Sequence, residues 1–335
     1  MPLKSDLSVA GEKLDPKNIS QATHEFNDNL IKIMEGGPKW YDVGAEKYRR
    51  MREAGETPLP APVLLEGGKN ITLPSRDQGR KIPCRVFEPS DGKAKGVFLH
   101  IHGGGWVLQS ERAQDPYLKF LADTCRMVVV SVGYRLAPEH PYPAPNEDCY
   151  DIGEYLIDNA EKDYGVPLLF LGGESAGGHL SAVTCLHLFK SRPKFAFKGL
   201  VLNYGVYDLS GLLPQAYNFK LPLVLDFEIM SKFIEAYAAG KSIEERRDPD
   251  ISPFFADLAS LRGKLPPALF TVGGQDLLLD DTVMMATKWM MSGNEGIMKI
   301  YPGAPHGFTL FLPSVKTETV KEAMDDIETF VGERC

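Results

Sequence analysis

The chain has 335 residues, which is enough for one large domain or two ordinary ones with a substantial buried core. Hydrophobic residues make up 43% of the chain and charged residues 24%, as is usual for globular proteins in water. The net charge of −8 argues against binding to nucleic acid or to anionic membranes through general electrostatics, so neither is expected as a partner.

Cysteine usage and the N-terminus indicate a compartment. The five cysteines are scattered, odd in number and form no C-x-x-C pair, so we expect buried free thiols in a reducing environment. The stretch from Met1 to Asp6 lacks the apolar core of a signal peptide, and no segment approaches the ~18 apolar residues of a membrane span. We therefore expect a cytoplasmic protein.

Residues 1–60 have a polar, helical pattern that is interrupted by a Gly-Gly-Pro turn. Apolar residues recur at helical spacing, at Phe26, Leu30, Ile31 and Met34. Two interpretations stay open here. The segment is either a peripheral amphipathic helix pair packed on the body of the protein or a lid over a pocket.

Further along, the pattern changes to that of a sheet protein. Strands are expected at 70–73 and 82–87, on either side of a charged turn. Strands then alternate with helices: strands at 96–101, 127–132, after Pro167, 200–204, 268–272 and 298–301, and helices at 115–125, 144–162, 280–292 and 316–332. Asp115, Asp280 and Asp281 are interpreted as helix caps. The alternation predicts an α/β fold with a mostly parallel central sheet flanked by helices, in which ligands bind at the carboxyl ends of strands.

One connection is too long for a simple crossover. About sixty residues separate the strands at 200–204 and 268–272. The gap contains a helix-like stretch at 227–239 and a charged, proline-rich loop at 244–253. We interpret it as a cap insertion at about 206–255.

The sequence Gly173-Glu174-Ser175-Ala176-Gly177 lies between an apolar strand and a helix. This is the pattern of a nucleophile elbow, in which a sharp turn holds a serine above the edge of the sheet. The residues two positions before and after the serine must be very small, because larger side chains would collide across the turn. Ser175 is therefore the candidate nucleophile.

Three consecutive glycines, Gly103 to Gly105, follow the strand at 96–101. Backbone N–H groups there can face a ligand without interference from Cβ atoms. We expect Gly103 and Gly104 to form an oxyanion hole together with the N–H of Ala176. The neighbouring His100 and His102 also permit a metal site, but glycines follow them instead of further ligands, so neither a metal nor another cofactor is expected.

Two further strand ends have polar residues that complete a catalytic set. Asp276 follows the strand at 268–272, and His306 lies in a Gly/Pro-rich loop after the last strand. The chain order Ser175, Asp276, His306 is that of α/β-hydrolases and differs from the orders in chymotrypsin-like and subtilisin-like proteases.

Together these stretches resemble the hormone-sensitive-lipase-like branch of the α/β-hydrolase superfamily. The matching segments span about residues 80 to 330 and are His102–Trp106, Tyr134–Ala144, Gly173–Gly178, the Asp276 loop and His306–Phe308. The resemblance implies the α/β-hydrolase fold, with a catalytic domain at 61–335 under a helical cap made from 1–60 and the insertion. Members of this branch are chiefly carboxylesterases for short to medium acyl chains. Its plant gibberellin receptors keep the fold but lack the catalytic histidine.

Two positions depart from the family's pattern. Glu174 stands where an aspartate usually precedes the nucleophile, and its longer side chain is expected to retune the pocket or an arginine partner. Leu277 replaces the proline that usually follows the acid, which is expected to loosen that loop. Arg135 and Asp148 are expected to form a buried structural ion network.

These features predict a serine hydrolase that cleaves carboxylic esters through an acyl-enzyme intermediate. The same triad also serves lactone, amide and acetyl hydrolysis, and a receptor on the same fold is a further alternative. The expected partner is a small ester substrate, bound by a monomer or a homodimer. Aromatic residues expected to contact the substrate are Trp106, Tyr204, Tyr207, Phe227 and Phe308.

Overall fold

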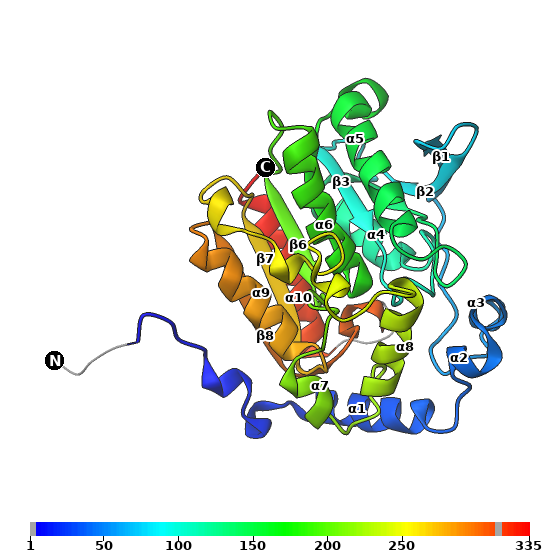
Figure 1. Cartoon of the computed structure of the whole chain (residues 1–335), viewed down its shortest axis with the longest axis vertical. Helices are drawn as coiled ribbons and strands as arrows, with labels where there is room; N and C mark the ends of the chain where they lie inside the picture. Colours follow the sequence, from blue (N-terminus) through cyan, green and yellow to red (C-terminus); the bar gives the residue numbers. More distant parts are fainter. Residues whose placement is uncertain (1–4, 312–316) are drawn as a thin grey trace.

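A computed structural model describes residues 5–311 and 317–335 and contains one eight-stranded sheet (Figure 1). The strand order is β1-β2-β4-β3-β5-β6-β7-β8; β1 and β2 run antiparallel to their neighbours, and all the other strands are parallel. The strands are β1 (Lys69–Pro74), β2 (Lys81–Phe87), β3 (Gly96–Ile101), β4 (Met127–Val132), β5 (Leu168–Glu174), β6 (Gly199–Asn203), β7 (Ala268–Gln275) and β8 (Gly296–Pro305). The predicted mostly parallel sheet is thus confirmed.

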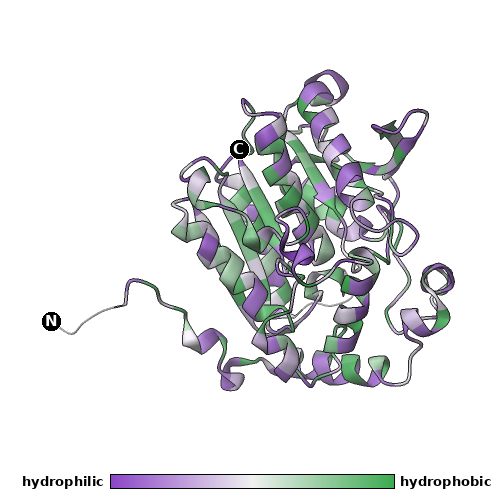
Figure 2. Ribbon diagram, in the orientation of Figure 1, coloured by the Kyte–Doolittle hydropathy of each residue, from purple (hydrophilic) through white to green (hydrophobic). Residues whose placement is uncertain are grey.

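Helices cover both faces of this sheet. They are α1 (Gln21–Met34), α2 (Trp40–Val43), α3 (Ala45–Glu53), α4 (Asp115–Asp123), α5 (Ala144–Tyr164), α6 (Ala176–Ser191), α7 (Pro214–Asn218), α8 (Phe227–Tyr237), α9 (Leu279–Met291) and α10 (Glu318–Gly332). Helices α5, α6 and α9 share one hydrophobic cluster with the sheet, and α4 and α10 share another. In Figure 2 the strands are mostly green, and purple is concentrated on the helices and loops around them.

The strands in the middle of the sheet are mostly apolar because both of their faces are buried. In β4, Val128, Val130 and Val132 belong to one cluster, whereas Met127 and Val129 belong to the other. Successive side chains of a strand point to opposite faces, so a strand between two helical layers needs apolar residues at every position. This is why an unbroken apolar run predicted the strand correctly.

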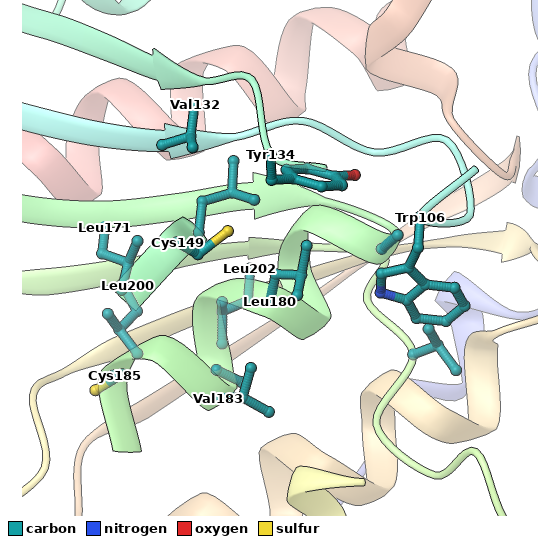
Figure 3. Close-up of a cluster of buried hydrophobic side chains, with 14 of the residues drawn as sticks. Trp106, Val132, Tyr134, Cys149, Leu171, Leu180, Val183, Cys185, Leu200 and Leu202 are labelled. Atoms are coloured by element: carbon teal, nitrogen blue, oxygen red, sulfur yellow. The ribbon is translucent and has the colours of Figure 1, made fainter. Parts of the chain in front are cut away.

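Helix α6 packs tightly on the strands beside it. Figure 3 shows Leu180 and Val183 of α6 close to Leu200 and Leu202 of β6, with Leu171 of β5 nearby. All of these side chains are buried. The turn between β5 and α6 is therefore held by a packed core on its interior side.

Two segments lie outside the layers. Helices α1, α2 and α3 precede β1, and α7 and α8 lie between β6 and β7, where an insertion was expected. In Figure 1 the N-terminal segment runs along one end of the molecule beneath α8. Among the described residues, no helix is both long enough and apolar enough to cross a membrane.

The interpretation of three aspartates as helix caps is wrong. Helix α4 begins at Asp115, but its N-cap residue is Gln114, and the carboxylate of Asp115 instead binds the guanidinium of Arg85 and the N–H of Leu65. Both Asp115 and Arg85 are buried. A charge without water needs a partner, so this pair outweighed the capping preference of aspartate.

Asp280 and Asp281 connect helix α9 to the insertion. Asp280 accepts a hydrogen bond from the N–H of Gln215, and Asp281 Oδ1 accepts bonds from the N–H groups of Tyr207 and Asp208. Burial raises the pKa of Asp281 to about 8. The carboxyl group of Asp281 therefore favours its protonated form in the folded protein.

The expected ion network around Asp148 is confirmed. Asp148 is fully buried and accepts hydrogen bonds from Arg80 and Arg135, with Arg135 Nη2 at 2.9 Å. Asp77 joins the same network through both arginines. These contacts hold the loop after β4 against α5.

Of the cysteines, four are buried and Cys335 is exposed, and all are free.

We predict that Asp115→Asn lowers the free energy of unfolding by about 3 kcal/mol, because it leaves the buried Arg85 guanidinium without a counter-charge. Urea denaturation followed by circular dichroism measures the change. The control is Glu46→Gln, which removes an exposed ion pair with Arg50 and should cost less than about 1 kcal/mol. Equal losses in the two variants would contradict the prediction.

A second prediction concerns pH. Unfolded Asp281 ionises near pH 3.9, whereas the folded protein retains this proton until about pH 8, so its contribution to stability is lost as the pH rises between these values. Asp281→Asn cannot ionise. Its stability relative to wild type should increase between pH 5 and 8 by at most about 1.4 kcal/mol per pH unit. Denaturation midpoints measured across this range test it, and a difference between the two proteins that does not change with pH would contradict it.

Candidate active site

Ser175 lies in the sharp turn between β5 and α6 with φ 56° and ψ −117°. This backbone conformation is strained for a residue with a side chain. The glycines around it make the turn possible. A Cβ on Gly173 would lie 2.1 Å from the carbonyl oxygen of Ile101, and a Cβ on Gly177 would lie 1.9 Å from the same atom. The turn therefore presses directly against the end of β3.

Ser175, His306 and Asp276 form a continuous hydrogen-bonded chain. His306 Nε2 is 2.9 Å from Ser175 Oγ, and His306 Nδ1 is 2.9 Å from Asp276 Oδ2 and 3.0 Å from Oδ1. Asp276 is fully buried and His306 is 5% exposed. The three residues come from the carboxyl ends of β5, β7 and β8. Parallel neighbours in the sheet bring these ends to one edge.

The partners of His306 define its tautomer. A carboxylate accepts hydrogen bonds, so Nδ1 carries a proton and donates it toward Asp276. Nε2 then has a free lone pair and accepts the hydroxyl proton of Ser175. Asp276 is itself held by the N–H of Leu278, which donates to Oδ1 at 2.8 Å. Leu277 and Leu278 are buried, so the leucine after the acid is anchored by packing.

The glycine-rich loop lies directly beside the serine. A Cβ on Gly103 would be 2.6 Å from the carbonyl oxygen of Glu174 and 3.4 Å from Ser175 Cβ. Gly104 has φ +99°, a conformation that favours glycine. Among the described residues, no carbonyl or side chain accepts from the N–H of Gly103 or Gly104, and Ala176 is the first residue of α6, where an N–H has no partner within the helix. All three amides lie at the cavity that contains Ser175.

Glu174 pairs with a histidine and not with the arginine that was expected. Its Oε2 is 2.9 Å from His100 Nε2, and His100 Nδ1 is 2.9 Å from Ser131 Oγ. Both Glu174 and His100 are buried. The glutamate side chain is long enough to reach from the elbow to His100 in the neighbouring strand, β3. His102 instead stacks on Tyr134, with ring centroids 4.2 Å apart, and burial lowers its pKa to about 3.

A cavity of about 330 Å³ opens above Ser175 and His306. Of the five aromatic residues expected to contact the substrate, only Trp106 lines it. The other four lie elsewhere. Tyr204 and Phe308 are buried behind His306, and the ring of Tyr204 is 5.2 Å from the imidazole. Tyr207 is buried beneath the insertion near Phe270, and Phe227 is 37% exposed against Tyr217.

Most of the remaining wall comes from the two segments outside the layers, and sequence reasoning did not identify these residues. The N-terminal segment contributes Met34–Trp40, Tyr48, Arg52, Pro58 and Leu59, and the insertion contributes Val206, Pro222, Val224–Asp226, Ile229, Met230 and Phe233. The apolar period of 227–239 indicated a buried helix face, but only packing determines what that face covers.

Specific contacts attach the N-terminal segment to the catalytic loops. Asn27 on α1 donates from Nδ2 to the carbonyl of Gly303 and to Gln275 Oε1, both at 2.8 Å. Trp40 stacks on Phe233 of α8 with ring centroids 5.2 Å apart. The segment thus touches the loops that carry Asp276 and His306, and it also touches the insertion.

The sequence matches known proteins along most of its length. Residues 98–310 match the model of a family described as alpha/beta hydrolase fold, Abhydrolase_3. An AB hydrolase superfamily protein of Schizosaccharomyces pombe is 31% identical over 322 residues, covering 91% of this chain and 89% of that protein. Carboxylesterase NlhH of Mycobacterium tuberculosis is 32% identical over 235 residues, covering 69% of this chain and 72% of that protein.

A solved structure shows the same arrangement. The hyperthermophilic esterase from the archaeon Pyrobaculum calidifontis superposes with a TM-score of 0.80 and 30% identity, over 92% of this chain and 97% of that chain. The chain belongs to the α/β-hydrolase family. The resemblance to its hormone-sensitive-lipase-like branch, inferred from the motifs, is confirmed.

The elbow geometry yields a steric prediction. Gly177→Ala should lower the unfolding temperature strongly or prevent folding, because the new Cβ would lie 1.9 Å from the carbonyl oxygen of Ile101, a backbone atom that cannot rotate away. Gly178→Ala is the matched control. Its Cβ would be 3.2 Å from Gly205 Cα and farther from its other neighbours, so the loss should be much smaller than for Gly177→Ala. Thermal unfolding by circular dichroism compares the two variants, and equal stability would refute the steric argument.

Proposed function

We propose that this protein is a serine carboxylesterase that hydrolyses carboxylic esters of short to medium acyl chain through an acyl-enzyme intermediate. The observation that carries the proposal is the chain of hydrogen bonds from Asp276 through His306 to Ser175. The esterase names of the relatives support the same reaction class.

In the proposed first step, His306 Nε2 takes the proton from Ser175 Oγ as the oxygen attacks the ester carbonyl. Asp276 stabilises the imidazolium that forms, because its carboxylate faces Nδ1. The amides of Gly103, Gly104 and Ala176 donate to the negative oxygen of the tetrahedral intermediate. As that intermediate collapses, His306 gives the proton to the departing alcohol.

In the second step, a water molecule takes the place of the alcohol. His306 removes a proton from the water, the hydroxide attacks the acyl-enzyme, and the proton returns to Ser175 as the carboxylic acid departs. The strained backbone at Ser175 keeps Oγ at the start of α6, next to the amide of Ala176.

The cavity supports the size range of the substrate. Its volume of about 330 Å³ is at the small end of the range of about 300–1,000 Å³ found for ligand pockets. Residues 1–60 and the insertion at 206–255 act in this proposal as a cap that excludes bulk water and bounds the acyl chain. Apolar side chains such as Ile229, Met230 and Phe233 face the cavity from the insertion.

We predict that Ser175→Ala abolishes the hydrolysis of 4-nitrophenyl acetate, butyrate and octanoate, and also abolishes labelling by a fluorophosphonate. The variant should fold normally, because the substitution removes only an oxygen atom. Release of 4-nitrophenol and mass spectrometry of the labelled protein provide the two measurements.

Ser181→Ala is the matched control on the same helix. The Ser181 hydroxyl is buried and has no hydrogen-bond partner among the described residues, so this variant should keep full activity. Full turnover by Ser175→Ala would refute the proposed function. Wild type that binds esters but resists the phosphonate would instead support a receptor.

A further inference from the structure

Helix α3 carries three arginines, and they differ in their partners. Arg49 binds the carbonyls of Val107 and Ala137 and the carboxylate of Glu139, while Arg50 pairs with Glu46 on the surface. The side chain of Arg52 has neither a hydrogen bond nor an ion pair to any described residue, and its Nη1 atom is buried. The residues outside the described ranges contain no aspartate or glutamate.

Arg52 lies where two cavities meet. The catalytic cavity and a second cavity of about 300 Å³ share Leu59, Gln109 and Leu310 as well as Arg52 in their walls. The position of Gln109 is tied to the glycine loop, since a Cβ on Gly104 would be 3.1 Å from Gln109 Cγ. A ligand that occupies the catalytic cavity above Ser175 can therefore extend to Arg52.

Two glutamine side chains in these walls are also without partners. Gln114, which is 5% exposed, has no partner for either Oε1 or Nε2, and Gln109 Oε1 also has none among the described residues. Natural proteins pair nearly all of their buried polar atoms. Several unpaired polar atoms around one connected space therefore indicate a built polar site.

The chemistry of this site is that of anion recognition. Arg52 is part-buried, and burial lowers the pKa of its guanidinium, with no carboxylate among the groups that offset this effect. Its buried Nη1 group has no partner among the described residues, and leaving such a group unpaired is costly. A carboxylate matches the fork of a guanidinium with its two oxygens, and its single charge balances that of one arginine. It also accepts from the Nε2 group of a glutamine, such as the unpaired Nε2 of Gln114, whereas the Oε1 atoms cannot donate to it.

We propose that Arg52, with Gln109 and Gln114, binds a carboxylate carried by the substrate, so that the protein prefers esters of dicarboxylic acids in which one carboxyl group is free. The preference for half-esters rests on the proposed esterase function. The binding of a carboxylate does not, and the two are tested separately.

The kinetic test compares mono-4-nitrophenyl esters of adipic and suberic acid with 4-nitrophenyl hexanoate and octanoate, which are neutral chains of the same length. Arg52→Met should lower kcat/KM for the half-esters by about tenfold or more, because a charge-assisted pair is lost, and should change kcat/KM for the neutral esters much less, because they carry no carboxylate. Arg52→Lys should recover part of the loss, since it restores the charge but not the fork.

Arg50→Met is the matched control, because it removes a paired, exposed arginine from the same helix and should change neither series. A direct titration of suberate by calorimetry provides a readout without turnover. Wild type and Arg50→Met should bind suberate, and Arg52→Met should bind it at least about tenfold more weakly.

The outcomes separate the two claims. Suberate binding that depends on Arg52 in a protein that cleaves no ester would refute the esterase function and support the site. Two results together would overturn the site and leave the esterase function intact. In the first, the protein cleaves neutral esters and Arg52→Met loses no preference for half-esters. In the second, suberate does not bind, or it binds equally well to wild type and Arg52→Met. An equal loss in both ester series would likewise count against carboxylate recognition.

Discussion

The contact between the elbow turn and the end of β3 constrains the whole active site. Backbone lies against backbone there, with no space for a Cβ at Gly173 or Gly177 beside the carbonyl of Ile101. This close approach forces Ser175 into its strained conformation and places the glycine loop after β3 next to the serine. The amides of that loop and of Ala176 therefore line the same cavity as the serine. Without this contact the serine would be an ordinary residue at the start of a helix.

Buried charge explains how the other parts are attached to this centre. Asp115 with Arg85, and Asp148 with two arginines, are fully paired and hold connections on the antiparallel side of the sheet. Glu174 with His100 is only partly paired, because one carboxylate oxygen has no partner among the described residues. Arg52 has none. Glu174 and Arg52 both line the catalytic cavity, where a ligand can supply part of the pairing.

Much of the fold could be predicted from local pattern. Apolar runs identified the strands because both faces of the sheet are buried, and the Ser, Asp and His positions followed from strand ends in a parallel sheet. The helix caps were predicted wrongly because a local preference was outweighed by a contact between residues far apart in the chain. An aspartate before a helix usually serves the helix, but Asp115 is buried beside an arginine thirty residues earlier in the chain, and an ion pair without water outweighs a cap.

The aromatic residues expected at the substrate show the limit of such reasoning. Tyr204 follows the carboxyl end of β6 and Phe308 lies two residues after His306, yet both side chains are buried in the core beside His306. The cavity wall is made instead by α2, α3 and α8, which are distant in the sequence from the elbow. The apolar period of a helix indicates that one of its faces is buried, but it does not identify the surface on which that face packs.

The sequence by itself determined the order of strands and helices, the tight turn at Ser175 and the three polar strand ends, because these depend on neighbouring residues and on the regular geometry of parallel sheets. Only the tertiary structure decided that Glu174 reaches His100, that the N-terminal segment lines the cavity above the serine and that Arg52 has no acidic partner among the described residues. Each of these depends on distances between residues far apart in the chain, and such distances are set by packing.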